Sequence, residues 1–164
     1  MGCDIHVMLE HRTRNKAQSW DSLGFNAINP GRDYEKFSRL AGVRGDGDGY
    51  AYVEPRGMPS DPSFGTQFEH WLFISEKPGN GERYVKPADA ERWVLQGIST
   101  YRDDKKWVSD PDQHTHTWLT LAEWLAAVDD GASTWSLDWK ALTAAAKSYE
   151  DNGHEVRFVF WFDN

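Results

Sequence analysis

Apolar and polar residues alternate along the first and last segments of the chain, and this period of two is typical of β-strands. In the N-terminal segment one face carries Cys3, Ile5, Val7 and Leu9, and the other carries Asp4, His6, Met8 and Glu10. In the C-terminal segment one face carries Val156, Phe158, Phe160 and Phe162, and the other carries Arg157, Val159, Trp161 and Asp163. The pattern predicts that both ends are sheet strands, and they could be neighbours.

Three further segments show the spacing of amphipathic helices. They span residues 87–97, residues 120–131 and a segment that opens near residue 136. Proline favours the first position of a helix, as at Pro87, and glycine often follows its end, as at Gly97 and Gly131. Thr120 and Glu123 have the spacing of a capping box. Residues 71–74 are predicted to form a short buried strand, and residues 83–85 could form another.

Residues 41–68 lack a clear period and contain six glycines and three prolines. Long irregular segments within compact domains are usually functional or mobile. The chain shows no internal repeat and no linker. We therefore expect residues 1–164 to form one α+β domain. It should contain a mostly antiparallel or mixed sheet with both terminal strands, about three helices and a long loop rich in glycine and proline.

Composition excludes several classes of protein. One cysteine in 164 residues cannot form an internal disulfide or a zinc site of several cysteines. With 26 acidic and 18 basic residues the net charge is −8, which disfavours general binding to nucleic acids. The sequence has no apolar run long enough to span a membrane, and we expect no secretory signal. Nine tryptophans either fill the core or line a pocket that stacks on a planar ligand.

Four polar residues could ligate a divalent metal such as Zn, Mn or Mg. Asp4 and His6 share one face of the first strand, where they could also form an acid–base pair or a plain hydrogen-bonded pair. His114 and His116 precede the helix that opens near residue 120, where they could bind a metal or a phosphate, or lie in a solvated loop. Asp61 could be a further ligand or base, or could only begin a turn.

Three arginines and two tryptophans are candidates for binding an anionic ligand. An arginine can hold a phosphate or carboxylate with two parallel hydrogen bonds, although Arg44, Arg56 and Arg157 could equally balance charge in an acidic protein. Trp118 and Trp161 lie close in sequence to these candidate residues, so they are the rings that we expect to stack on a ligand.

Blocks along the whole chain resemble a family of small proteins encoded by phages and prophages. The most specific block is the opening Met-Gly-Cys-Asp-Ile-His, and others lie at residues 34–37, 40–44, 56–63, 114–123 and 157–164. In the family the histidine block reads His-Ser-x-Ser, and here Thr115 and Thr117 take the serine positions. The resemblance therefore supports His114 more than His116. It implies a phage accessory protein in the bacterial host cytosol and implies no activity. Small phage proteins of this kind often interfere with host defence, and by that analogy we expect a role against host defence.

Three functions are compatible with these residues. The first is a metal-dependent phosphoesterase in which Asp4, His6 and His114 hold the metal, with His116 or Asp61 as a further ligand. The second is a non-catalytic protein that sequesters a nucleotide-like signal, alone or as a homo-oligomer. The third is an acidic protein that inhibits another protein. The first two share one expected partner, a small anionic ligand.

Overall fold

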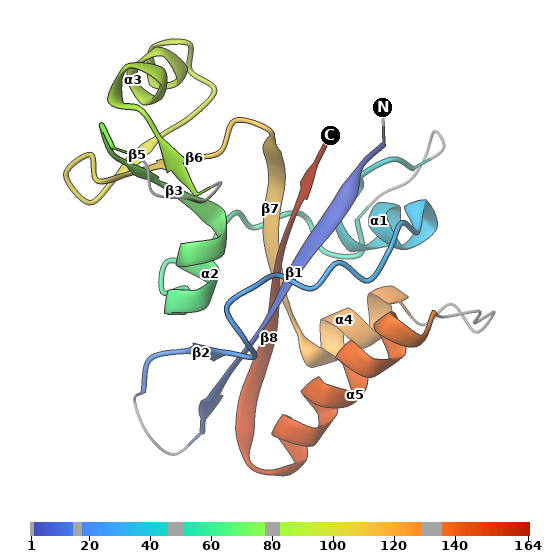
Figure 1. Ribbon diagram of the computed structural model, residues 1–164. Coiled ribbons are helices and arrows are strands. Elements are labelled where there is room, and N and C mark those ends of the chain that lie inside the picture. Colours follow the sequence, from blue (N-terminus) through green and yellow to red (C-terminus); the bar gives the residue numbers. More distant parts are fainter. Residues whose placement is uncertain (1, 15–17, 46–50, 78–82, 129–135) are drawn as a thin grey trace.

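Two four-stranded sheets organise the described part of the chain, and both terminal strands lie in the larger one, sheet A (Figure 1). The computed structural model describes residues 2–14, 18–45, 51–77, 83–128 and 136–164. Sheet A contains β1 (Asp4–Thr13), β2 (Asp21–Ser22), β7 (Gln113–Thr120) and β8 (His154–Asp163), in the order β2-β1-β8-β7. Its strands are antiparallel, and β1 pairs with β8 along its whole length. The prediction that both terminal segments are strands of a sheet is confirmed.

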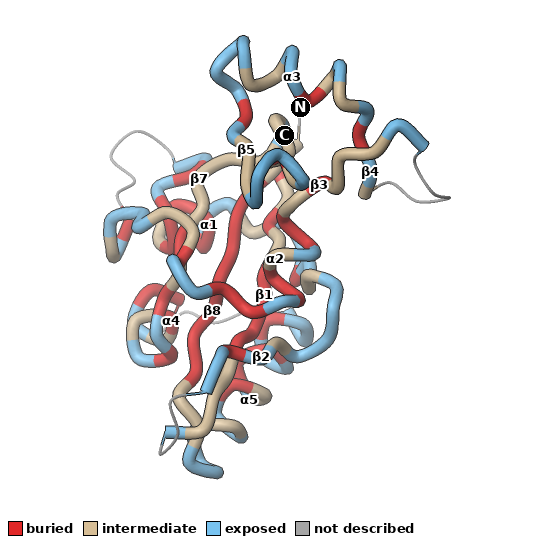
Figure 2. Tube along the Cα trace, turned by 90° about the vertical axis from the view of Figure 1, so that its left-hand side faces the viewer, coloured by how far each residue is buried: buried red, intermediate tan, exposed pale blue. Residues whose placement is uncertain are grey.

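Three helices cover one face of sheet A, which we call the helix face (Figure 1). They are α1 (Tyr34–Ala41), α4 (Leu121–Val128) and α5 (Leu137–Asp151). On this face the alternate apolar residues of β1 and β8, from Ile5 to Leu9 and from Val156 to Phe162, form the main core with the helices. β8 is buried along most of its length (Figure 2). The Trp124 ring of α4 stacks on Phe158 of β8 at 4.0 Å between centroids. Trp139 of α5 stacks on Trp124 at 5.5 Å.

The capping box predicted at the start of α4 is present. The Glu123 backbone N–H donates to Thr120 Oγ1 at 3.3 Å, and the Thr120 N–H donates to Glu123 Oε2 at 2.9 Å. These two bonds satisfy backbone donors that have no partner within the helix. They also fix the turn by which β7 passes directly into α4.

The opposite face of sheet A, here called the second face, is covered by α2 (Phe64–His70) and the segment before it. Met58 of that segment packs against the apolar cluster that Met8 of β1 forms with Val159 and Trp161 of β8. A side chain at Gly65 would place its Cβ 2.1 Å from Ser22 Oγ, so only glycine lets α2 lie this close to β2.

Sheet B and α3 (Pro87–Leu95) form a smaller layer at one end of sheet A (Figure 1). Sheet B contains β3 (Trp71–Ile74), β4 (Tyr84–Val85), β5 (Tyr101–Arg102) and β6 (Trp107–Ser109), in the order β4-β3-β6-β5. Only β3 and β4 run parallel. Leu72, Val85, Ala90 and Val108 form its small core. Within the described ranges, no helix is long and apolar enough to cross a membrane.

The predicted α+β class is confirmed, but the described residues contain five helices rather than about three and two sheets rather than one. α1 and α2 were not predicted because each has eight residues or fewer, too few to establish a period. The expected loop of residues 41–68 therefore contains most of α2. Residues 46–50 of that loop and Gly131, the expected end of the second helix, lie outside the described residues.

We predict that Trp124→Ala lowers the free energy of unfolding by about 3–5 kcal/mol. The ring is fully buried, stacks on Phe158 and donates from Nε1 to Thr143 Oγ1 at 3.0 Å. Urea unfolding followed by circular dichroism measures the loss. Leu95→Ala is the control, because Leu95 is 81% exposed and its loss should cost less than about 0.5 kcal/mol. Equal effects of the two variants would contradict the assignment of Trp124 to the core.

Candidate functional site

A buried ion pair joins the two central strands on the second face. Glu10 of β1 and Arg157 of β8 are opposite each other in the register, and Arg157 Nε donates to Glu10 Oε2 at 2.6 Å. Glu10 is 0% exposed and Arg157 is 5% exposed. Buried charges need partners for every polar atom, because desolvating an unpaired charge costs several kcal/mol. The other atoms of this pair are indeed bound.

The free oxygen of Glu10 binds the start of α2. The Ser63 backbone N–H and the Thr66 hydroxyl each donate to Glu10 Oε1 at 2.6 Å. Ser63 also caps the helix, since its Oγ accepts the Thr66 N–H at 3.2 Å. The carboxylate therefore fixes α2 on the second face.

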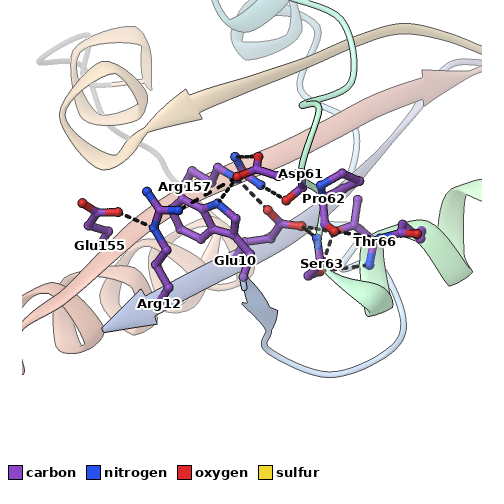
Figure 3. A network of polar contacts seen from close by, with 10 residues as sticks. Glu10, Arg12, Asp61, Pro62, Ser63, Thr66, Glu155 and Arg157 are labelled. Carbon is purple, nitrogen blue, oxygen red and sulfur yellow. Dashed lines mark hydrogen bonds and ion pairs between the residues drawn. The ribbon is translucent and has the colours of Figure 1, made fainter. Parts of the chain in front are cut away.

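Asp61 takes the remaining nitrogens of Arg157 (Figure 3). Arg157 Nη1 donates to Asp61 Oδ1 at 2.9 Å, and Nη2 donates to the Asp61 carbonyl at 2.8 Å. The Trp20 indole N–H donates to Asp61 Oδ2 at 3.1 Å. Partial burial raises the pKa of Asp61, but Arg157 and Trp20 lower it by more, so the pKa lies below its ordinary value. Asp61 is thus an ionised acceptor near neutral pH.

Guanidinium groups and indole rings contact each other in an alternating series. Arg12 and Arg157 lie 4.4 Å and 4.0 Å from the centre of the Trp20 ring. Arg157 and Arg56 lie 5.8 Å and 4.6 Å from the centre of the Trp118 ring. All these distances are within the range of cation–π contacts. The series therefore links three arginines through two tryptophans.

A cavity of about 590 Å³ opens beside this series. We call it the arginine–tryptophan pocket. It is lined by Arg12, Arg14, Trp20, Asp61, Trp118, Thr120, Glu150, Glu155, Val156 and Arg157. Its size falls within the usual range of small-molecule sites, about 300–1,000 Å³.

The structure brings together two residues predicted for anion binding, Arg157 and Trp118, and Asp61, which was predicted as a metal ligand or a base. Arg157, Asp61 and Trp118 line the pocket, and Arg56 lies against Trp118 outside the lining set. Arg56 also holds Glu123, where Nη1 donates to Oε2 at 3.0 Å. This bond lowers the pKa of Glu123.

Two other predicted residues lie elsewhere. Arg44 donates to the side chain of Asn164 at 2.9 Å, at the end of sheet A where both chain ends lie. Trp161 is 0% exposed and packs against Met8 on the second face, with its ring 5.9 Å from that of His6. Neither residue lines the pocket.

Asp4 and His6 lie on the second face near the chain ends, each bound to a partner. Arg32 donates to both oxygens of Asp4, at 2.8 and 2.9 Å, and these bonds lower the pKa of Asp4. His6 Nε2 lies 2.8 Å from Asp163 Oδ2. His6 and Asp163 line a separate cavity of about 260 Å³. The carboxylate that contacts His6 is thus that of Asp163, whereas the spacing along the first strand predicted that of Asp4.

A β-bulge separates His114 from His116. Both histidines were expected in a loop before the helix, but they lie within β7. The register of β7 against β8 shifts between His114 and Thr117. Within this bulge Thr115 has a positive φ of +51°. His114 is opposite Phe162 and therefore points to the helix face. The extra residue turns His116 to the second face, where its ring lies 4.5 Å from that of His70.

The expected metal ligands consequently do not form one set. Asp4 and His6 lie on the second face, whereas His114 lies on the helix face. Among the described residues, no three His, Cys, Asp or Glu side chains gather as a metal site. No catalytic step through a metal follows from this arrangement, and the metal-dependent activity stays a prediction.

Sequence reasoning missed Glu10, Arg12, Arg14 and Trp20 as site residues. Glu10 and Arg12 continue the polar face of β1 that begins with Asp4, and Arg14 follows directly after the strand. Extending the alternation to residue 14 would have found them. Trp20 belongs to no periodic segment, so only its contacts in the folded chain identify it.

We predict strong energetic coupling between Glu10 and Arg157. Each single alanine variant should lose about 3–5 kcal/mol of unfolding free energy, because it leaves a buried charge without its partner. The double variant should lose clearly less than the sum. A double-mutant cycle by urea unfolding measures the coupling. The exposed pair Asp89 and Arg92 on α3 is the control, with an expected coupling below about 0.5 kcal/mol. Additive losses at Glu10 and Arg157 would contradict the prediction.

We also predict that acid destabilises the protein through two buried histidines. Burial lowers the pKa of His70 to about 3 and that of His116 to about 4. The unfolded chain takes up these protons near pH 6.5 and the folded chain does not. Stability is therefore complete above about pH 6.5 and falls as the pH drops toward 4.

Chemical unfolding at a series of pH values between 6.5 and 4.5 tests this effect. Over the acid part of this window, His116→Gln should reduce the pH slope of the unfolding free energy by about 1.4 kcal/mol per pH unit. The slope is the readout, because the substitution also changes the absolute stability. Equal slopes in both proteins would show that His116 is protonated in the folded state.

Comparison of the chain with protein-family models, with curated protein sequences and with solved structures finds no match in any of the three. The function of this chain is therefore inferred from the arginine–tryptophan pocket. The pocket combines arginine guanidinium groups with indole rings around a cavity large enough for a small molecule.

Proposed function

We propose that the protein binds a small anionic, nucleotide-like ligand in the arginine–tryptophan pocket and sequesters it. The observation that carries this proposal is the series of guanidinium groups and indole rings along one cavity. A nucleotide carries both groups that such a site can bind. Its phosphate can accept paired hydrogen bonds from an arginine, and its base can stack on an indole ring.

Arg12 and Arg14 are the best candidates to hold the phosphate. Arg12 is paired with Glu155 at 2.5 Å and Arg14 with Glu150 at 3.5 Å, and all four side chains are at least one-third exposed. Exposed pairs of this kind contribute only about 0–1 kcal/mol, so a phosphate can displace the carboxylates at little cost. Arg157 differs because its nitrogens are already bound to Glu10 and Asp61.

Trp118 is the best candidate for contact with the base. Its ring is half-buried and lines the cavity. Arg56 holds the ring through a cation–π contact at 4.6 Å and is itself held by Glu123. The ring is therefore fixed before a ligand arrives, which reduces the entropic cost of binding.

The pocket favours binding over catalysis. Among the described residues that line it, none is a histidine or a cysteine. Asp61 accepts bonds from Arg157 and Trp20, and its lowered pKa makes it a poor base. In the phage setting that the sequence resemblance implies, a protein of this kind would withhold a nucleotide signal from the host.

Binding assays with defined nucleotides test the proposal. Cyclic AMP, cyclic di-AMP and AMP serve as probes, and quenching of tryptophan fluorescence reports binding. We expect one of them to bind wild type, and the double variant Arg12→Ala and Arg14→Ala to bind it at least about tenfold more weakly. Arg92→Ala is the matched control, because it removes an exposed arginine from α3, far from the pocket lining.

The fate of the bound nucleotide separates sequestration from hydrolysis. After incubation with Mn²⁺ or Zn²⁺, the protein is denatured and the released nucleotide is analysed by chromatography. Intact nucleotide supports sequestration, and a hydrolysed product supports the phosphoesterase instead. Equal affinity in wild type and the double arginine variant would contradict the assignment of the pocket.

A further inference from the structure

His11 of β1 and His154 of β8 lie close together on the helix face of sheet A. They are at the end of these two strands that is far from the chain termini. His11 Nδ1 and His154 Nδ1 lie 3.2 Å apart, and their rings are inclined by 62°. In the register His11 is opposite Val156, so His154 is its diagonal neighbour on the same face. Neither residue belongs to the arginine–tryptophan pocket.

Both rings are held by regular structure. The strands set the separation of the two backbones, and Tyr149 of α5 stacks on His11 at 3.9 Å and 14°. Tyr149 also contacts the His154 ring at 5.5 Å. Sites built on strands and helices hold their geometry better than sites on loops.

We propose that His11 and His154 bind a divalent transition metal through their Nδ1 atoms, with Zn²⁺ as the suitable probe. Imidazole nitrogens are preferred ligands of Zn, Cu and Ni. Two nitrogens at about 2.0–2.1 Å from a tetrahedral zinc lie about 3.3–3.4 Å apart, close to the separation found here. Water or a carboxylate would complete the coordination.

The charges around the pair are compatible with a bound cation. Asp21 of β2 is opposite His11 in the register and therefore shares its face. Burial and His154 together lower the pKa of His11, although Asp21 raises it. His11 is therefore neutral near pH 7, as a metal ligand must be. Arg14 donates to the His154 carbonyl but is paired with Glu150.

Metal binding needs no net loss of protons from the pair. Without a metal, one Nδ1 carries the proton of the hydrogen bond between the rings. When both Nδ1 atoms bind the metal, that proton moves to Nε2 of the same ring through exchange with water. In the metal-bound form each imidazole then carries its proton on Nε2.

Titration of the metal-free full chain with Zn²⁺ tests the site, with thermal unfolding as the readout. At a hundredfold excess over the Kd, the unfolding temperature of wild type should rise by roughly 5–10 °C. His11→Gln and His154→Gln should each lose this shift. His6→Gln is the control, because His6 lies on the second face and belongs to the ligand set predicted from sequence. It should keep the shift.

Nitrogen NMR of the imidazole rings provides a readout that does not depend on variants. Of the six histidines, only His11 and His154 should change their Nδ1 resonances when Zn²⁺ is added. Unchanged resonances for both would overturn the proposal, and the pair would then be held by a hydrogen bond alone. A thermal shift that persists in both glutamine variants, or that disappears in His6→Gln, would overturn it too.

Discussion

The buried pair of Glu10 and Arg157 is the interaction on which the second face of sheet A depends. One carboxylate and one guanidinium lie opposite each other on the two central strands, where Glu10 is fully buried and Arg157 is 5% exposed. Neither charge tolerates an unpaired polar atom there. Glu10 therefore fixes the start of α2 through Ser63 and Thr66, and Arg157 fixes Asp61. A single pair thus anchors both α2 and the segment before it, whose Asp61 lines the pocket (Figure 3).

The two faces of sheet A carry different chemistry because alternation along β1 and β8 separates apolar from polar side chains. The helix face is a core of stacked rings around Trp124, whereas the second face combines apolar contacts with ionised groups. At the second face, arginines contact tryptophan rings as well as carboxylates. These rings allow several cations to lie close together, since the indole faces attract them.

Net charge alone gives a misleading picture of this protein. The chain carries eight excess negative charges, yet one cavity is lined by three arginines that balance its three carboxylates. Their carboxylate partners differ in exposure. Glu10 is fully buried and holds Arg157 permanently, while Glu150 and Glu155 are exposed and can yield to another anion. The buried pair of Glu10 and Arg157 is therefore structural, whereas the exposed pairs of Arg12 and Arg14 can exchange their carboxylate for another anion.

Sequence by itself determined the two terminal strands, the apolar face that each of them gives to the main core, and the capping box of α4, because period and local hydrogen bonding suffice for these. It also selected Arg157, Asp61 and Trp118, but not that they share a cavity with Trp20. Only the tertiary structure decided which polar residues meet. The bulge at Thr115 sends His114 and His116 to opposite faces of sheet A, whereas an unbroken strand would place both on one face. The pairing of β1 with β8 brings His11 to His154 across most of the sequence. Such contacts depend on strand register, and register is fixed by packing over the whole sheet rather than by local sequence.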